Sequence, residues 1–323
     1  MLQATTTKTK PVLAELTETS LEAVVGNTPL LQLQRITRHL PAGVRVFAKL
    51  EWNNPSGSIK DRAALYVLRA ALQAGELGRG RVLLDSTSGN MGIAYATLAA
   101  ARGIAVKLCM PENASRERIA VLRALGASLV LTDAAEGSDG AILKARELAA
   151  AEPEQYYYAD QYNNPASWHA HYHTTGPEII AQTAGQITHL VAGLGTAGTM
   201  IGTGRCLKQY SANITLVAVQ PDAAFHGIEG WKHMASSIQP GIYDAALPDR
   251  QFAVRTEDAL LATRRLAKEE GLFAGISAGA ATVAALQLAA TMQAGHIVVI
   301  FPDSGYKYLS DRMWQPQPQP AGI

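Results

Sequence analysis

One lysine stands in an unusual position within the segment NNPSGSIKDRAA, residues 53–64. Lys60 follows a Pro-Ser-Gly-Ser turn and directly precedes Asp61, Arg62 and a run of good helix formers. If a helix begins near Ser58, Lys60 lies in its first turn, where free backbone N–H groups carry a partial positive charge. That charge, Arg62 and some burial are expected to lower the lysine pKa and to favour Schiff-base chemistry. The alternative is an ordinary Ser58 N-cap beside a lysine that faces solvent.

A second turn, STSGNMG at residues 86–92, stands between a predicted strand and a predicted helix. Small hydroxyl residues, a glycine and an asparagine at a helix N-terminus place several N–H and O–H donors together. Such donors suit a carboxylate or a phosphate. An ordinary capped turn between a strand and a helix is the alternative.

A third turn, GLGTAGTMIGTG at residues 193–204, follows the predicted strand THLVA. Gly193, Gly195 and Gly198 satisfy the dinucleotide pattern G-x-G-x-x-G. An NAD site would have an acidic residue at the end of the next strand, where this chain has Gln220. A monophosphate therefore fits the loop better than NAD. The three turns together suggest pyridoxal 5′-phosphate, and an NAD-dependent oxidoreductase is the main rival in another reaction class.

Short apolar runs alternate with alanine-rich helical runs, which is the pattern of an α/β fold with mostly parallel strands. The strands are expected to be buried on both faces because they are continuous apolar runs. We predict strands at residues 44–52, 81–87, 105–111, 128–133, 188–195, 214–220 and 296–302, and helices at 59–75, 91–103, 115–126 and 139–153. A polar Asn-Pro turn at 161–167 is the expected change between two lobes.

The composition excludes several classes of protein. A net charge of +1 over 323 residues gives no field that would attract nucleic acid or an acidic membrane. The two cysteines, Cys109 and Cys206, are far apart, which indicates a reduced, cytoplasmic protein. The sequence contains no run of about 20 apolar residues, so no membrane span is predicted. The histidines of WHAHYH, residues 168–173, have no carboxylate among them, and we expect no metal site.

Several motifs, in order and spacing, resemble the cysteine synthase branch of the fold-type-II pyridoxal-phosphate enzymes. They are VVGNTPLLQL, NNPSGSIKDRAA, STSGNMGIAYA, NNPASWHAHYHTTGPEI, GLGTAGTMIGTGR, GLFAGISAGAA and SGYKYLSD, and they cover roughly residues 20 to 312. The resemblance implies a two-lobed fold, similar to the tryptophan synthase β chain, in which each lobe is a mostly parallel twisted sheet flanked by helices. We expect a smaller lobe at 48–162, a larger cofactor lobe at 20–47 plus 163–313, a mobile extension at 1–19 and a mobile tail at 314–323.

The resemblance also assigns roles to individual residues. Lys60 matches the lysine that holds the cofactor and moves the α-proton. Asn90 matches the residue that binds the ring hydroxyl, and Ser277 matches the serine that faces the pyridine nitrogen. The match to the phosphate loop comprises Gly195, Thr196, Ala197, Gly198 and Thr199. The match to the substrate-carboxylate grip comprises Thr87, Ser88 and Gln161, with Asn90 and Met91 beside it.

The implied reaction is β-replacement on an O-activated L-serine, either O-acetylserine or O-phosphoserine, through an α-aminoacrylate. Sulfide or another sulfur donor, with a sulfur-carrier protein as one option, then gives L-cysteine. Met91 stands where most cysteine synthases have threonine, so β-cyanoalanine synthesis or an amine nucleophile is the alternative. Lys232, in the segment 225–234 with His226 and His233, is expected to meet a substrate phosphate, unless these are solvated loop residues. A homodimer is expected.

Overall fold

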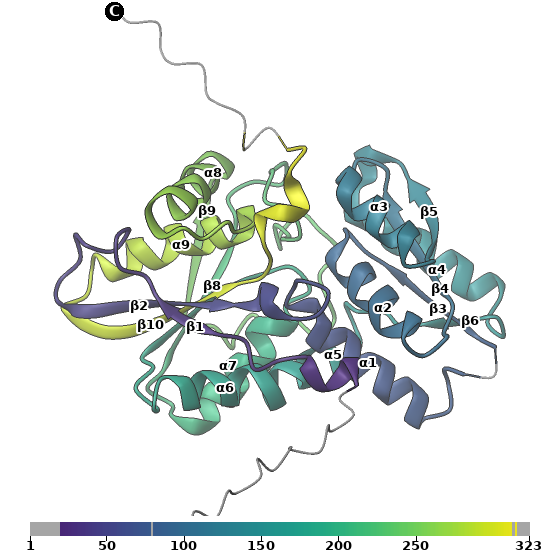
Figure 1. The fold of residues 1–323 in the computed structure, drawn as a ribbon, viewed down its shortest axis with the longest axis horizontal. Helices are drawn as coiled ribbons and strands as arrows, with labels where there is room; N and C mark the ends of the chain where they lie inside the picture. The colour runs from purple at the N-terminus through teal and green to yellow at the C-terminus, as the bar shows by residue number, and fades with distance from the viewer. Residues whose placement is uncertain (1–19, 79, 312–313, 315–323) are drawn as a thin grey trace, which may run out of the picture.

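Two sheets organise the chain, as Figure 1 shows. The computed structural model describes residues 20–78, 80–311 and 314. The predicted extension at 1–19 lies outside the described residues, as does the predicted tail apart from residue 314. The predicted α/β class with two mostly parallel sheets flanked by helices is confirmed.

The larger sheet has six strands in the order β1-β2-β10-β7-β8-β9. All neighbouring pairs are parallel except β1 with β2. The strand bounds are β1 Leu30–Gln32, β2 Gly43–Leu50, β7 His189–Gly193, β8 Thr215–Pro221, β9 Arg250–Val254 and β10 Ala294–Phe301.

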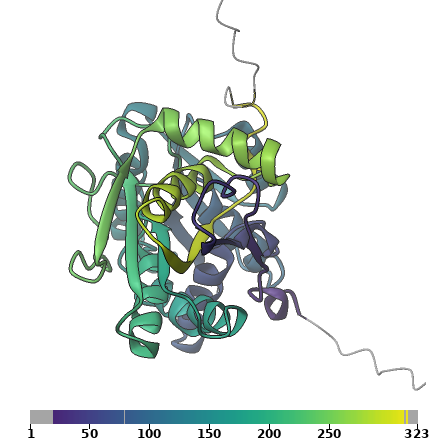
Figure 2. The same ribbon diagram turned by 90° about the vertical axis from the view of Figure 1, so that its left-hand side faces the viewer.

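The central strands of this sheet are buried on both faces because helices cover both (Figures 1 and 2). In β7, Val191 packs in one hydrophobic cluster while its neighbours Leu190 and Ala192 pack in another. The first cluster contains residues of helices α8 Thr256–Arg265 and α9 Ile276–Ala289, and the second contains residues of α6 Gly176–Gln182 and α7 Gly198–Tyr210. Continuous apolar strands are therefore required.

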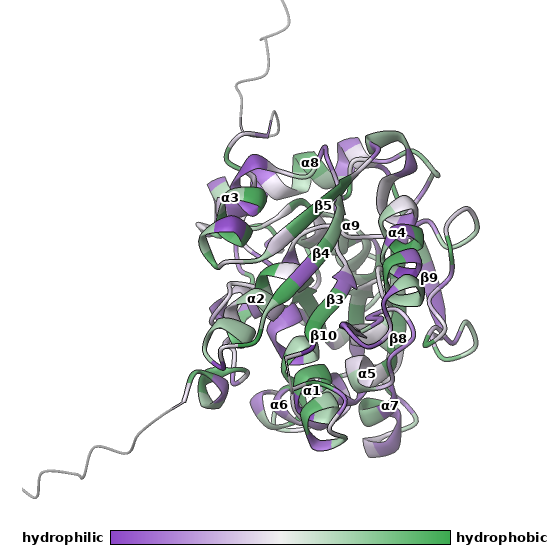
Figure 3. Ribbon diagram, turned by 90° about the vertical axis from the view of Figure 1, so that its right-hand side faces the viewer, coloured by the Kyte–Doolittle hydropathy of each residue, from purple (hydrophilic) through white to green (hydrophobic). Residues whose placement is uncertain are grey.

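The smaller sheet has four parallel strands in the order β5-β4-β3-β6. Helices α1, α2 and α3 pack against one face and α4 against the other. Figure 3 shows β4 and β5 as largely hydrophobic strands within this layer. The bounds are β3 Val82–Ser86, β4 Val106–Pro111, β5 Ser128–Thr132, β6 Tyr156–Tyr158, α1 Lys60–Gln73, α2 Asn90–Ala100, α3 Arg116–Ala124 and α4 Gly137–Ala151.

The chain leaves the smaller sheet after β6 and next enters the larger sheet at β7. The predicted turn at 161–167 lies in this connection. The predicted boundary at residue 48 falls inside β2, which pairs with β10 as far as Leu50. The division into two lobes at the predicted residues stays a prediction. Shorter helices complete the structure: α5 Ala166–Ala170, η1 Leu21–Val24, η2 Glu51–Asn53, η3 Ala134–Glu136, η4 His171–Thr175, η5 Leu266–Glu270 and η6 Gly305–Tyr308.

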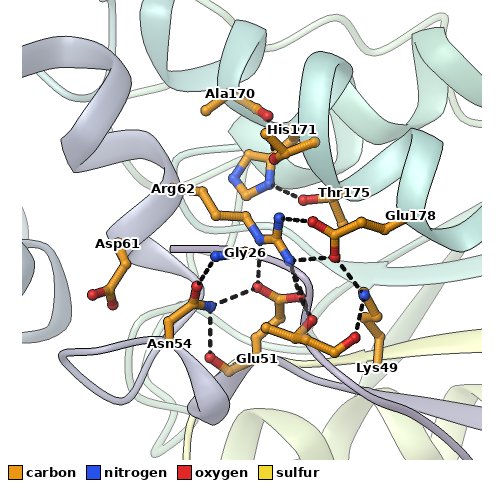
Figure 4. Close-up of polar contacts among 12 residues, drawn as sticks. Gly26, Lys49, Glu51, Asn54, Asp61, Arg62, Ala170, His171, Thr175 and Glu178 are labelled. Atoms are coloured by element: carbon orange, nitrogen blue, oxygen red, sulfur yellow. Dashed lines mark hydrogen bonds and ion pairs between the residues drawn. The ribbon is translucent and has the colours of Figure 1, made fainter. Parts of the chain in front are cut away.

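A buried ion cluster joins helix α1 to the larger sheet and to α6 (Figure 4). The guanidinium of Arg62 donates to Glu51 at 2.7 Å and 2.9 Å, and to Glu178 at 2.6 Å and 2.8 Å. Lys49 of β2 donates to the same Glu178 at 2.6 Å. Because Lys60 is the first residue of α1, this cluster fixes the helix that carries it. No described helix is long and apolar enough to cross a bilayer.

Candidate active site

A cleft collects most of the residues that the sequence singled out. It lies where β3, β7 and β10 end, since its lining includes Gly193, the last residue of β7, and Thr87 and Pro302, which directly follow β3 and β10. The predicted residues that line it are Lys60, Thr87, Ser88, Asn90, Met91, Gln161, Gly195, Thr196, Thr199, Lys232 and Ser277. Ala197 and Gly198 belong to the same loop as Gly195 but are not among the lining residues.

Lys60 reaches this cleft from the N-terminus of α1. Ser58 is fully buried, its backbone bridges to Asp303, and its Oγ accepts the Lys60 N–H at 3.3 Å. Burial lowers the pKa of Lys60 to about 8, and the negative charge of Asp303 opposes that shift. Arg62 was expected to contribute, but its guanidinium is taken up by two carboxylates of the buried cluster. Lys60 is partly exposed and lies in the lining of the cleft, not on the open surface.

The turn after β3 presents hydroxyl and N–H groups to the cleft. Thr87 Oγ1 accepts the N–H groups of Gly89 at 2.9 Å and Gly92 at 3.1 Å, which fixes the start of α2. Gly89 has φ of +141°, and a Cβ there would lie 2.2 Å from Arg118 Cδ. This position therefore requires glycine, and the tight turn leaves Ser88 in the cleft lining.

Gln161 is held beside this turn from the end of β6. Its Nε2 donates to the Ser86 carbonyl at 2.5 Å. Asp85 accepts the backbone N–H groups of Ser86 at 2.8 Å and Gln161 at 3.2 Å. Burial raises the pKa of Asp85 to about 8, so this carboxyl is mostly protonated at neutral pH. The two segments predicted to hold the substrate carboxylate are thereby fixed to each other.

The side-chain amide of Asn90 has a defined orientation. Its Nδ2 donates to Asp303 Oδ2 at 2.7 Å, and its Oδ1 accepts from Lys307 Nζ at 2.8 Å. Burial lowers the pKa of Lys307 to about 8, and Asp303 opposes the shift. One Nδ2 hydrogen of Asn90 is then free to donate to a ligand in the cleft. The sequence predicted Asn90 but neither of the residues that orient it.

The glycine loop between β7 and α7 approaches a second loop very closely. A Cβ at Gly195 would lie 2.3 Å from the Gly230 carbonyl oxygen, so only glycine fits. Ala197, the residue directly before α7, has φ of +67°. The first backbone N–H groups of α7 follow this residue and have no partner within the helix. Thr199 Oγ1 lies 3.4 Å from His171 Nε2. Burial and neighbouring cations hold the pKa of His171 well below its usual range, so this imidazole is neutral.

Lys232 is not a solvated loop residue, which was the alternative for segment 225–234. It is buried, it lines the cleft, and its Nζ forms an ion pair with Asp139 Oδ1 at 2.5 Å. Its Nζ also lies 5.1 Å from the ring centroid of Tyr162. Sequence analysis missed Asp139 because it is 93 residues from its partner and belongs to no motif. Among the three candidates of that segment, His226 lies outside this cleft and His233 contacts Ser236 at 2.8 Å.

Arg118 of α3 forms a second polar network at the cleft. It donates to the Ser88 carbonyl at 3.0 Å and to the Tyr308 hydroxyl at 2.5 Å, and it forms an ion pair with Glu229. Asp303 Oδ2 lies 3.6 Å from its Nη2. Glu229 and Tyr308 line the cleft. Sequence reasoning did not identify Glu229, and it considered a cofactor-lining role for Tyr308 but favoured core packing. Within the described residues, no group of three or more histidine, cysteine or acidic side chains is placed to hold a metal ion.

Comparisons with known proteins agree with this geometry. The profile of the family described as "Pyridoxal-phosphate dependent enzyme" matches residues 21–303. The chain belongs to this family. A "Cysteine synthase" from Aquifex aeolicus is 51% identical over 296 residues, which cover 90% of each chain. A "Cysteine synthase B" from Salmonella typhimurium is 43% identical and covers 90% of this chain and 94% of its own.

A solved structure shows the same fold. The "Cysteine Synthase (OASS) from Entamoeba histolytica" superposes with a TM-score of 0.87 at 32% identity, covering 99% of this chain and 96% of its own. The predicted cysteine synthase branch, fold-type-II architecture and pyridoxal 5′-phosphate cofactor are therefore confirmed. These matches give no support to the rival interpretation of the glycine loop as an NAD site.

The residues of the cleft fit pyridoxal 5′-phosphate. Lys60 Nζ has no hydrogen-bond acceptor within the part of the chain described by the structure, so its amine is available. Gly195 and Thr196 of the glycine loop line the cleft, and the N-terminus of α7 follows this loop directly. Ser277, near the start of α9, also lines the cleft.

Proposed function

We propose that this enzyme catalyses β-replacement on an O-activated L-serine and that sulfide is the incoming nucleophile, giving L-cysteine. The observation that carries the proposal is a single cleft lined by Lys60, the Thr87 and Ser88 turn, Gln161 and Ser277. The relatives described as cysteine synthases support it. When bound, the cofactor withdraws electrons from the substrate α-carbon, which makes the α-proton acidic and the β-substituent a leaving group.

The side chains of this enzyme have separate roles in the proposal. Lys60 holds the cofactor covalently and moves the α-proton, for which its lowered pKa is suited. The donors of the turn at 86–92 and Gln161 hold the substrate carboxylate. Gly195, Thr196, Ala197, Gly198 and Thr199 hold the cofactor phosphate at the start of α7.

Asn90 and Ser277 contact the cofactor ring in this proposal. The free Nδ2 hydrogen of Asn90 donates to the ring hydroxyl, with the amide held by Asp303 and Lys307. Ser277 faces the ring nitrogen as a neutral group. A neutral partner leaves that nitrogen unprotonated, which favours elimination of a good leaving group over transamination. Met91, buried in the cleft lining, lies beside the substrate-carboxylate donors.

The test is cysteine formation from sulfide with O-acetyl-L-serine and with O-phospho-L-serine. Lys60→Ala is expected to reduce turnover by about 10³-fold, the size of a lost proton-transfer group. Lys144→Ala, a change at a partly exposed lysine away from the cleft, is the matched control and should retain full activity. If the unaltered enzyme makes no cysteine from either donor, the proposal fails. Cyanide in place of sulfide tests the alternative product, β-cyanoalanine.

We further propose a cytoplasmic homodimer that uses free sulfide, with a sulfur-carrier protein as the alternative donor. The two cysteines are free thiols, which supports a reducing compartment. Gel filtration combined with light scattering tests the dimer. A monomer at micromolar concentration would contradict it.

A further inference from the structure

The ion pair between Lys232 and Asp139 lies at the edge of the cleft and joins separate parts of the chain. Asp139 is near the start of α4, which packs on the four-stranded sheet, while Lys232 follows β8 of the six-stranded sheet. The side chain of Lys232 is only 4% exposed, and that of Asp139 is 31% exposed. Because the pair is short and its lysine end is buried, Asp139 offsets much of the lysine charge.

Asp139 is held in place by more than the lysine. Its second carboxylate oxygen accepts the backbone N–H of Ile238 at 2.9 Å. Ser138, the preceding residue, lines the same cleft as Lys232. The carboxylate is therefore anchored to the backbone and cannot move away from Lys232 without losing a hydrogen bond.

The cleft has few other positive charges for an anionic leaving group. Its lining contains two lysines, Lys60 and Lys232, and one carboxylate, Glu229. Lys60 is committed to the cofactor. Arg118, which approaches from α3, is already paired with Glu229 and lies near Asp303. A phosphate dianion would therefore depend on Lys232, whose charge is taken up by Asp139.

We propose that Asp139 is a specificity-determining residue that selects a serine activated by a neutral acyl ester over one activated by a phosphate. This inference rests on the proposed function. In the net reaction, O-acetylserine and hydrosulfide give cysteine and acetate, so the bound ester is neutral and the leaving group carries one negative charge. The phosphate of O-phosphoserine would place about two negative charges beside Asp139, and the Asp139 carboxylate would repel them.

The experiment measures kcat/KM with sulfide for O-acetyl-L-serine and for O-phospho-L-serine. Asp139→Asn is expected to raise the ratio of the phospho donor to the acetyl donor about tenfold, because the freed lysine can meet the phosphate. Lys232→Gln is expected to lower the ratio, since it leaves Asp139 as an unpaired negative charge. In the double variant the gain of Asp139→Asn should disappear.

Asp249→Asn is the matched control. Asp249 pairs with Lys208 at 2.8 Å and accepts the Leu216 N–H at 2.6 Å, the same pattern as Asp139 but away from the cleft. The proposal is overturned if Asp139→Asn leaves the ratio unchanged, or if Asp249→Asn raises it equally. Should Asp139→Asn fail to fold, an unchanged ratio in Lys232→Gln overturns the proposal instead. If the unaltered enzyme formed no cysteine from either donor, the proposed function itself would be refuted, and this result differs from a change in the donor ratio of a variant.

Discussion

Burial of Lys60 carries a cost in stability that depends on pH. Its pKa falls from 10.5 to about 8 because the charged amine is poorly solvated, while Asp303 opposes the shift. Below pH 8 both folded and unfolded chains carry the proton, so the full cost is present. Between pH 8 and pH 10.5 the unfolded chain binds more protons, and stability rises with pH.

Replacing Lys60 with methionine should therefore stabilise the cofactor-free protein at pH 7. The gain should shrink as the pH approaches 10, because the unaltered lysine is then neutral in the folded state. Urea unfolding of both proteins at pH 7 and at pH 9.5 measures the two differences. A gain that is equal at both pH values would show that the lysine is not the titrating group.

At this scale the sequence predicted Lys60 and burial as a cause of its lowered pKa, but it wrongly assigned a share to Arg62 and missed the opposing charge of Asp303. The turn and the helix start are local and can be recognised from residues 53–64. The position of Arg62 is not local, because its partners Glu51 and Glu178 come from η2 and α6. Asp139 was missed for the same reason, since its role depends on a lysine from another part of the fold.

Helix α1 depends on the buried cluster around Arg62, and this dependence can be titrated. The pKa of Glu178 is held at about 2 by the hydrogen bonds and charges of Arg62 and Lys49, against the opposing effect of burial. A carboxyl with a lowered pKa stabilises the fold above pH 4.5, and that stability is lost as the pH falls toward 2. The shift corresponds to about 3 kcal/mol.

Glu178→Gln is expected to reduce the free energy of unfolding at pH 7 by about 3 kcal/mol. It should also flatten the fall in stability between pH 5 and pH 3. Denaturant unfolding at several pH values measures both effects. Glu147→Gln, which breaks an exposed pair with Lys144 on α4, is the control and should change stability by less than about 0.5 kcal/mol. An equal loss in both variants would contradict a special role for the cluster.

Among the elements, the long apolar strands were predictable and the short ones were not. All seven predicted strands exist, and so do the four predicted helices. β1, β6 and β9 were not predicted. β1 and β6 have only three residues each, too few to show a clear pattern in the sequence, and all three strands lie at sheet edges. The place of β6 is set by its pairing with β3, which is distant in the sequence, and a local pattern does not contain that partner.

In the whole molecule, Arg118 connects the two sheets beside the cleft. It belongs to α3 over the four-stranded sheet, while Glu229, Asp303 and Tyr308 follow strands of the six-stranded sheet. Burial raises the pKa of Glu229, and the positive charge of Arg118 opposes this shift. Removing the cation would thus leave the buried Asp303, the partly exposed Glu229 and the Tyr308 hydroxyl without their shared partner.

Arg118→Met should loosen the contact between the two sheets without unfolding either one. Breaking one partner of a buried pair costs about 3 to 5 kcal/mol, and the loss should fall on the contact that spans the cleft. Hydrogen exchange is expected to rise at residues 225–231 and 303–308, and KM for the serine donor should rise because the Ser88 carbonyl loses its donor. Arg205→Met, which removes a cation over the Trp168 ring away from the cleft, is the control. An equal rise in hydrogen exchange across both sheets in Arg118→Met would instead indicate global destabilisation. That result would contradict a role for Arg118 in joining the two sheets.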